Sequence, residues 1–204
     1  MHKKETIMTF KEIRFTGDKA KYVTPSWDQL DELTLQVAKQ IKESDIKFDL
    51  IIALAKGAWP MSRSFFDYTG IKELASLGVK FYSGINKRLD KPEIYQQIPT
   101  AIKGKKILIF DDVADTGESL SFTQDYLLKE GASEVKTATL FIKPWSTFMP
   151  DFHGADSDAW IIFPFEKREM RDLLGKSWEK QGAIETEISK RHKEIGLSQE
   201  VLDL

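Results

Sequence analysis

The residues from Ile107 to Leu120 carry the clearest chemistry in this chain. Four apolar residues run into the adjacent carboxylates Asp111 and Asp112, and a loop with hydroxyl and glycine residues then leads into a helix-compatible segment. The apolar run is typical of a buried parallel strand. The loop hydroxyls and the unpaired N–H groups at the start of a helix suit an anion. Because carboxylates bind a metal ion or sugar hydroxyls rather than a phosphate, the stretch predicts a site for a sugar phosphate.

The whole stretch resembles the 5-phosphoribosyl-1-pyrophosphate (PRPP) motif of the type I phosphoribosyltransferases. Members of that family have a hydrophobic strand, two acids, two small or apolar residues, Asp or Ala, then Thr, Gly and a hydroxyl residue, and this chain fills each position. The resemblance implies that Asp111 and Asp112 contact the ribose hydroxyls and hold Mg²⁺, directly or through water. It also implies a binding loop for the 5-phosphate, made of Ala114, Asp115, Thr116, Gly117, Glu118 and Ser119.

An acidic strand end also occurs in P-loop enzymes, which need the motif G-x-x-x-x-G-K-[ST] after a strand. The Gly-Lys-Ser sequence at Gly175–Ser177 has Met170 where the first glycine should stand, and it follows a charged segment. A P-loop site is therefore not supported.

Composition sets further limits. A chain of 204 residues can hold one sizeable core and has room for a small subdomain. With 30 basic and 32 acidic residues, the net charge of −2 favours neither nucleic acid nor a membrane surface as a partner. No apolar run is long enough for a spanning helix and no signal peptide is recognisable, so we expect a cytoplasmic protein. The absence of cysteine excludes disulfides and thiolate metal sites.

Strand and helix patterns alternate from Asp49 to Ile142, which predicts an α/β fold with a mainly parallel twisted sheet flanked by helices. Before them, Ser26 can cap a helix that ends near Ser44. We expect residues 1–166 to form the phosphoribosyltransferase core with a small base-binding hood. The charged residues 167–204 predict one or two amphipathic helices that pack on the core or at a subunit interface.

Lys56 and Gly57 follow the predicted strand 49–55, at the edge of the sheet where ligands bind in open α/β folds. The resemblance implies that this loop, which often contains a cis peptide in the family, holds pyrophosphate. Glycine lets the backbone approach the ligand closely, and the lysine supplies charge. Taken alone, the pair would be an ordinary turn.

Residues 83–104 show no convincing periodicity, and a connection of that length is usually a lid or a disordered segment. In the family a flexible loop at this point folds over the reacting sugar. Lys87 and Arg88 are then candidates to approach the pyrophosphate. A solvated basic loop is the alternative, and the sequence leaves both open.

The segment around Trp160 and Ile161 resembles the base-binding region of 6-oxopurine phosphoribosyltransferases, where an aromatic residue stacks on the purine. The resemblance also gives Lys143 the role of donating to the purine O6. A cationic donor favours an oxo group over the amino group of adenine, because the mismatch leaves a buried charge unpaired. The alternative for Trp160 is an ordinary core residue.

Asp115 discriminates among the members of the family. Those acting on orotate or adenine commonly lack an acid at this position, whereas 6-oxopurine members have aspartate that exchanges a proton with purine N7. The resemblance therefore implies transfer of phosphoribose from PRPP to hypoxanthine, guanine or xanthine, giving a nucleoside monophosphate in a homodimer or homotetramer. Transfer to another base, or a nucleotide-sensing regulatory protein of the same fold, are the alternatives.

Overall fold

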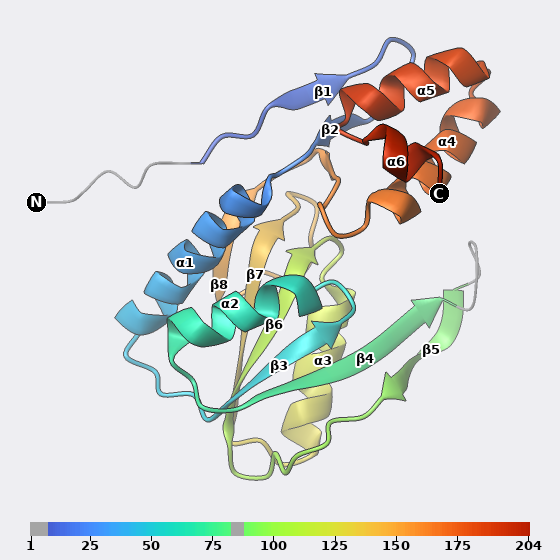
Figure 1. Ribbon diagram of the computed structural model, residues 1–204. Coiled ribbons are helices and arrows are strands. Elements are labelled where there is room, and N and C mark those ends of the chain that lie inside the picture. The colour runs from blue at the N-terminus through green and yellow to red at the C-terminus, as the bar shows by residue number, and fades with distance from the viewer. Residues whose placement is uncertain (1–7, 83–87) are drawn as a thin grey trace, which may run out of the picture. The chain divides into compact units, whose positions relative to one another are not determined.

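The computed structural model describes residues 8–82 and 88–204 of the protein (Figure 1). The chain divides into two compact units. The larger unit contains residues 30–157. The smaller unit consists of two segments, the N-terminal residues that end at Gln29 and residues 158–204.

The larger unit is built on a six-stranded sheet in the order β5-β4-β3-β6-β7-β8. Its strands are β3 (Leu50–Ala55), β4 (Leu74–Tyr82), β5 (Arg88–Gln96), β6 (Lys106–Ala114), β7 (Glu134–Ile142) and β8 (Phe152–Asp156). Every neighbouring pair is parallel except β4 and β5, which are antiparallel. The predicted fold class is confirmed.

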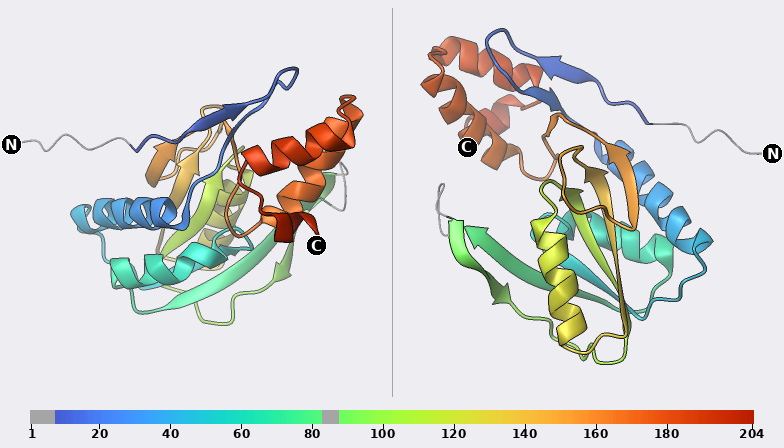
Figure 2. Two further views of the ribbon diagram at one scale, coloured as in Figure 1. Left: turned by 45° about the horizontal axis from the view of Figure 1, so that its top comes forward. Right: turned by 180° about the vertical axis from the view of Figure 1, so that it is seen from behind.

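Helices cover both faces of this sheet. α1 (Trp27–Glu43) and α2 (Trp59–Thr69) lie on one face, and α3 (Glu118–Lys129) lies on the other, as the front and back views show (Figures 1 and 2). The predicted cap of α1 is confirmed, because the Gln29 N–H donates to Ser26 Oγ at 3.1 Å. In return, the Ser26 N–H donates to Gln29 Oε1 at 2.9 Å, which completes a capping box.

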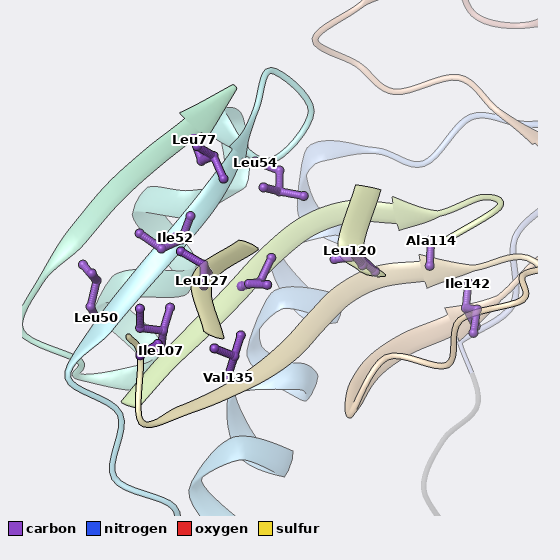
Figure 3. Packing of buried hydrophobic residues seen from close by; sticks show 12 residues of the cluster. Leu50, Ile52, Leu54, Leu77, Ile107, Ala114, Leu120, Leu127, Val135 and Ile142 are labelled. Carbon is purple, nitrogen blue, oxygen red and sulfur yellow. The ribbon is translucent and has the colours of Figure 1, made fainter. Parts of the chain in front are cut away.

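The core of the larger unit surrounds the apolar run of β6. Residues Ile107 to Phe110 are fully buried, and Ile107 and Ile109 pack with side chains from β3, β7 and α3 (Figure 3). Burial on both faces explains why this strand has no polar alternation. Because β6 pairs in parallel with β3 and with β7, the carboxyl ends of all three strands meet at one edge of the sheet.

Two strands of the larger unit were absent from the sequence-based expectation. The prediction that residues 83–104 lack regular structure is wrong for their middle part, where β5 pairs with β4. Pro92 conceals the pattern, but an edge strand tolerates proline. The segment before Asp158 contains β8, whose backbone pairs with β7 although little of its sequence is apolar.

The smaller unit has a three-stranded sheet and the C-terminal helices. β1 (Glu12–Arg14) pairs with β2 (Lys21–Val23), which pairs in parallel with β9 (Trp160–Ile161). The helices are α4 (Lys167–Lys180), α5 (Glu185–Glu194) and α6 (Gln199–Leu202), three where the sequence predicted one or two. The predicted domain boundary after residue 166 falls inside this unit, between β9 and α4.

Trp178 is the centre of this unit. Its fully buried indole donates to Asp18 Oδ2 at 2.8 Å and packs edge-on against Tyr22. The contact ties the N-terminal hairpin to α4 across 160 residues of sequence. In the part of the chain that the structure describes, no helix combines the length and the apolar character needed to cross a membrane.

Candidate active site

The carboxyl ends of β3, β6 and β7 gather most of the predicted site residues. The Lys56–Gly57 turn follows β3, Asp111 and Asp112 lie in the last part of β6, and Lys143 follows β7. All of them belong to the larger unit. A shared edge of parallel strands is where open α/β folds bind ligands.

Asp111 and Asp112 form a pair of half-buried carboxylates. Each is fixed by a backbone hydrogen bond: the Asp112 N–H donates to Asp111 Oδ1 at 3.0 Å, and the Val113 N–H donates to Asp112 Oδ1 at 2.8 Å. Burial raises the pKa of Asp112 to about 6. Burial and then the neighbouring charge of Asp112 raise the pKa of Asp111 well above its ordinary value. The pair is therefore costly to ionise unless a cation or hydroxyl donor joins it.

The turn after β3 lies directly against this pair. The Ala55–Lys56 peptide bond is cis, at the point where the family resemblance expects one. A Cβ atom added to Gly57 would lie 2.5 Å from Asp112 Oδ2, so no larger residue fits there without a shift. Lys56 is exposed and Gly57 is half-buried. The turn thus brings a cationic side chain and accessible backbone close to the carboxylates.

The predicted phosphate loop runs from buried Ala114 to the first turn of α3. Gly117 has φ 83° and occupies the N-cap position of that helix. Among the loop hydroxyls, Thr116 Oγ1 accepts from the Glu118 N–H at 3.4 Å. The N-cap glycine makes no side-chain hydrogen bond to the helix, and the first N–H groups of an α-helix have no acceptor within the helix. This is the local geometry that binds phosphate oxygens in other proteins.

A second loop, residues 145–148, packs onto the phosphate loop. The backbone N–H and the hydroxyl of Thr147 both donate to the Thr116 carbonyl, at 3.1 and 3.0 Å. A Cβ atom on Gly117 would lie 2.4 Å from Phe148 Cβ. The two loops are therefore in close contact, and this contact requires glycine at position 117.

Asp115 has a partner that the sequence analysis missed. The Trp145 indole N–H donates to Asp115 Oδ1 at 2.9 Å. Lys143 is 7% exposed, and its backbone N–H donates to the Ala114 carbonyl at 3.0 Å. Its side-chain Nζ lies 5.6 Å from the centre of the Trp145 ring. The sequence signal that could have identified Trp145 as a site residue is its position two residues after Lys143. Trp145 thus contacts both residues that the resemblance assigns to the base.

Trp160 and Ile161 belong to the smaller unit. Trp160 is 44% exposed, and its indole N–H donates to Met170 Sδ at 3.3 Å. Ile161 is buried, and it pairs with Val23. In its own unit Trp160 therefore has the exposed ring surface that stacking would need, and it is not a core residue.

Of the predicted lid residues, Lys87 lies outside the described residues, and Arg88 is the first residue of β5. Within residues 8–82 and 88–204, no group of three or more His, Asp or Glu side chains could hold a metal ion. The carboxylates of Asp111 and Asp112 are thus two oxygen ligands that would need others from a substrate or water.

Gly117→Ala tests the contact between the two loops. Gly104 also has a positive φ, 76°, but has open space around its missing Cβ, so Gly104→Ala is the matched control. We expect the control to lose about 1–2 kcal/mol of unfolding free energy and Gly117→Ala about 2–5 kcal/mol, because the latter adds a steric clash. Urea denaturation measures both. Equal losses would contradict the packing of Phe148 on Gly117.

Asp112→Asn tests the buried like-charge pair. The pKa of Asp112 is raised to about 6 in the folded chain, whereas the pKa of an aspartate in an unfolded chain is about 4. Ionisation of Asp112 therefore destabilises the folded state progressively as the pH rises above about 4. In EDTA, we expect the variant to melt about 2–4 °C above the wild-type chain at pH 7.5, the shift that about 1 kcal/mol produces at this size. At pH 4 the two should melt together. A constant gap between them at both pH values would argue against the raised pKa.

Comparison with known proteins agrees with this geometry. The chain is 26% identical over 143 residues to the xanthine-guanine phosphoribosyltransferase of Idiomarina loihiensis, covering 69% of this chain and 84% of that protein. It is 30% identical over 117 residues to the hypoxanthine-guanine phosphoribosyltransferase of Lactococcus lactis, covering 55% of this chain and 63% of that enzyme.

A solved structure is also similar. The purine phosphoribosyltransferase from Pyrococcus horikoshii is 34% identical with a TM-score of 0.63, and the match covers 71% of this chain and 93% of that one. Residues 26–167 match the family model described as the phosphoribosyl transferase domain, which spans the sheet, the phosphate loop and the carboxylate pair. The resemblance drawn from the PRPP motif is thereby confirmed, and the chain belongs to the phosphoribosyl transferase domain family.

Proposed function

We propose that this protein transfers the 5-phosphoribosyl group of PRPP to N9 of a 6-oxopurine base in purine salvage. The products are the nucleoside 5′-monophosphate and pyrophosphate. The observation that carries the proposal is that Asp115, Lys143 and the phosphate loop share one sheet edge with the Asp111–Asp112 pair. The names of the relatives, which are purine phosphoribosyltransferases, support the class of base and do not favour a regulatory protein.

PRPP would lie along this edge. The backbone N–H groups and hydroxyls of residues 114–119 would bind the 5-phosphate, and Asp111 and Asp112 would accept from the ribose hydroxyls. Lys56 and the backbone at Gly57 would hold the pyrophosphate. The short separation between Gly57 and Asp112 supports this order, because the turn after β3 lies beside the carboxylate pair.

Mg²⁺ fits the donor set. Two carboxylates whose pKa values are raised by burial gain from a divalent cation, and hard oxygen ligands suit Mg²⁺. When bound, Mg²⁺ neutralises the charge of the departing pyrophosphate. Asp111 and Asp112 would hold it directly or through water, and PRPP oxygens would supply the other ligands.

The base would be selected by residues from β7 and the loops. Lys143 would donate to O6, and Asp115 would accept the N7 proton while N9 forms its bond to C1 and the bond from C1 to pyrophosphate breaks. The family resemblance assigns stacking on the purine to Trp160, and contacts at the purine 2-position to main-chain atoms near Ile161 and Phe165; these assignments stay predictions. Stacking of this kind contributes about 1–3 kcal/mol in other base-binding sites.

Lid closure by the segment around Lys87 and Arg88, assembly as a homodimer or homotetramer, and a cytoplasmic location stay predictions. A closed lid would exclude water, so that PRPP is transferred and not hydrolysed.

An assay with purified protein tests the function. We would mix the chain with PRPP and Mg²⁺ and, in turn, hypoxanthine, guanine, xanthine, adenine, uracil and orotate, and follow nucleotide formation by absorbance. We expect product with at least one of the three 6-oxopurines, none with orotate, and loss of the reaction when EDTA replaces Mg²⁺. If none of the bases gives a product, the proposed transferase activity is rejected.

Asp115→Asn tests the proposed proton acceptor. Loss of the carboxylate should lower turnover about ten-fold or more, the range for a general acid–base group, while the KM for PRPP changes little. Steady-state kinetics with both substrates varied separates the two effects. Turnover equal to that of the wild-type chain would reject the role.

Asp67→Asn is the matched control for this variant. Asp67 lies on α2, is exposed, and pairs with Arg63 at 3.2 Å on the same helix. The change from Asp to Asn has the same chemistry there, and we expect the kinetic constants to stay within about two-fold of wild type, as for an exposed ion pair. A similar fall in both variants would mean that charge, and not position, matters.

A further inference from the structure

Trp145 is a half-exposed aromatic residue with an unexpected partner. Its side chain is 54% exposed, yet the indole N–H donates to Asp115 Oδ1 at 2.9 Å. An exposed tryptophan needs no carboxylate, since water can satisfy its single donor. An exposed aspartate beside a helix start would likewise be free to adopt several rotamers. The hydrogen bond selects one of them.

The backbone holds Trp145 in this position. The Ser146 N–H donates to the Lys143 carbonyl at 2.9 Å, which closes a turn around Trp145. One residue later, Thr147 donates twice to the Thr116 carbonyl, at 3.1 and 3.0 Å. The turn is therefore anchored on both sides of Trp145, to β7 and to the phosphate loop. A donor held by rigid backbone can orient its acceptor.

We propose that Trp145 is a positioning residue for Asp115, an inference that rests on the function proposed above. The indole N–H occupies Oδ1 and leaves Oδ2 to accept the proton of a purine ring nitrogen. Neither oxygen then has to reorient when the base binds, and preorganisation of this kind lowers the barrier to the chemical step. Trp145 itself donates to no atom of the base.

The ring of Trp145 has a second contact that an experiment must hold constant. Lys143 Nζ lies 5.6 Å from the ring centre, a cation–π distance. Trp145→Phe keeps an aromatic ring beside Lys143 and removes the N–H donor. Trp145→Ala removes both. The Phe variant therefore isolates the hydrogen bond to Asp115, and the difference between the two variants reports the contact with Lys143.

The test is a double-mutant cycle in the transferase assay with hypoxanthine, guanine or xanthine. We expect Trp145→Phe to lower kcat about 5- to 10-fold, the effect of one solvent-accessible hydrogen bond of ordinary strength, with the KM for PRPP unchanged. In the Asp115→Asn background, the same substitution should change kcat less than about two-fold, because the residue acts through Asp115.

A matched control is Tyr68→Phe. The exposed Tyr68 hydroxyl donates to Asp31 Oδ2 at 2.6 Å, so this variant also removes one aromatic donor from an aspartate, away from the sheet edge. Its kcat should equal that of the wild-type chain. Trp145→Phe with wild-type kcat, or losses that multiply in the double variant, would overturn the inference while leaving the proposed function intact. A wild-type chain inactive with every base would reject the function, and the inference with it.

A measurement without turnover complements the kinetics. The chain has five tryptophans, so a spectrum of ¹⁵N-labelled protein should show five indole N–H signals. We expect one of them to move in Asp115→Asn and to be the one that disappears in Trp145→Phe, with no comparable shift in Tyr68→Phe. If no indole signal responds to Asp115→Asn, the hydrogen bond is absent in solution and the inference is wrong. This variant leaves Trp145 in place, so the result does not depend on how Trp145→Phe folds.

Discussion

The parallel pairing of β6 with β3 and β7 is the constraint on which the rest of the larger unit depends. It is stabilised by the apolar run Ile107–Phe110, which is fully buried and is followed directly by Asp111. Parallel strands all end at the same edge, so the turn after β3, the acids of β6 and the loop after β7 meet there regardless of their separation in sequence. The geometry of the candidate site follows from backbone hydrogen bonding before any side chain is considered.

The same arrangement explains why the acids are unfavourable without a ligand. Asp111 and Asp112 directly follow the four buried residues of the strand and are therefore themselves half-buried. In that position the two carboxylates lose solvation and repel one another. The turn at Gly57 lies against the same pair, because a Cβ atom added there would be 2.5 Å from Asp112 Oδ2. Stability is thus given up where ligand binding can recover it, as is common at functional sites.

The loops contribute orientation. The segment from Trp145 to Phe148 is exposed at its first residue and packed at its last, and it contacts the phosphate loop through Thr116, Gly117 and Asp115. A single short loop therefore links the residues assigned to the phosphate with those assigned to the base. A loop that is held by several backbone contacts keeps a polar side chain in place better than an unsupported loop does.

The sequence by itself determined the class of fold, the buried central strand, the capped helix at Ser26 and the phosphoribosyl motif, because each is a local pattern of residue types. It did not reveal β5 or β8, since edge strands depend on a neighbour's backbone more than on their own composition. Nor did it reveal the bond between Trp145 and Asp115, thirty residues apart, or the contact of Gly57 with Asp112. Those contacts exist because parallel pairing brings distant strand ends together, and only the tertiary structure decides which side chains then meet.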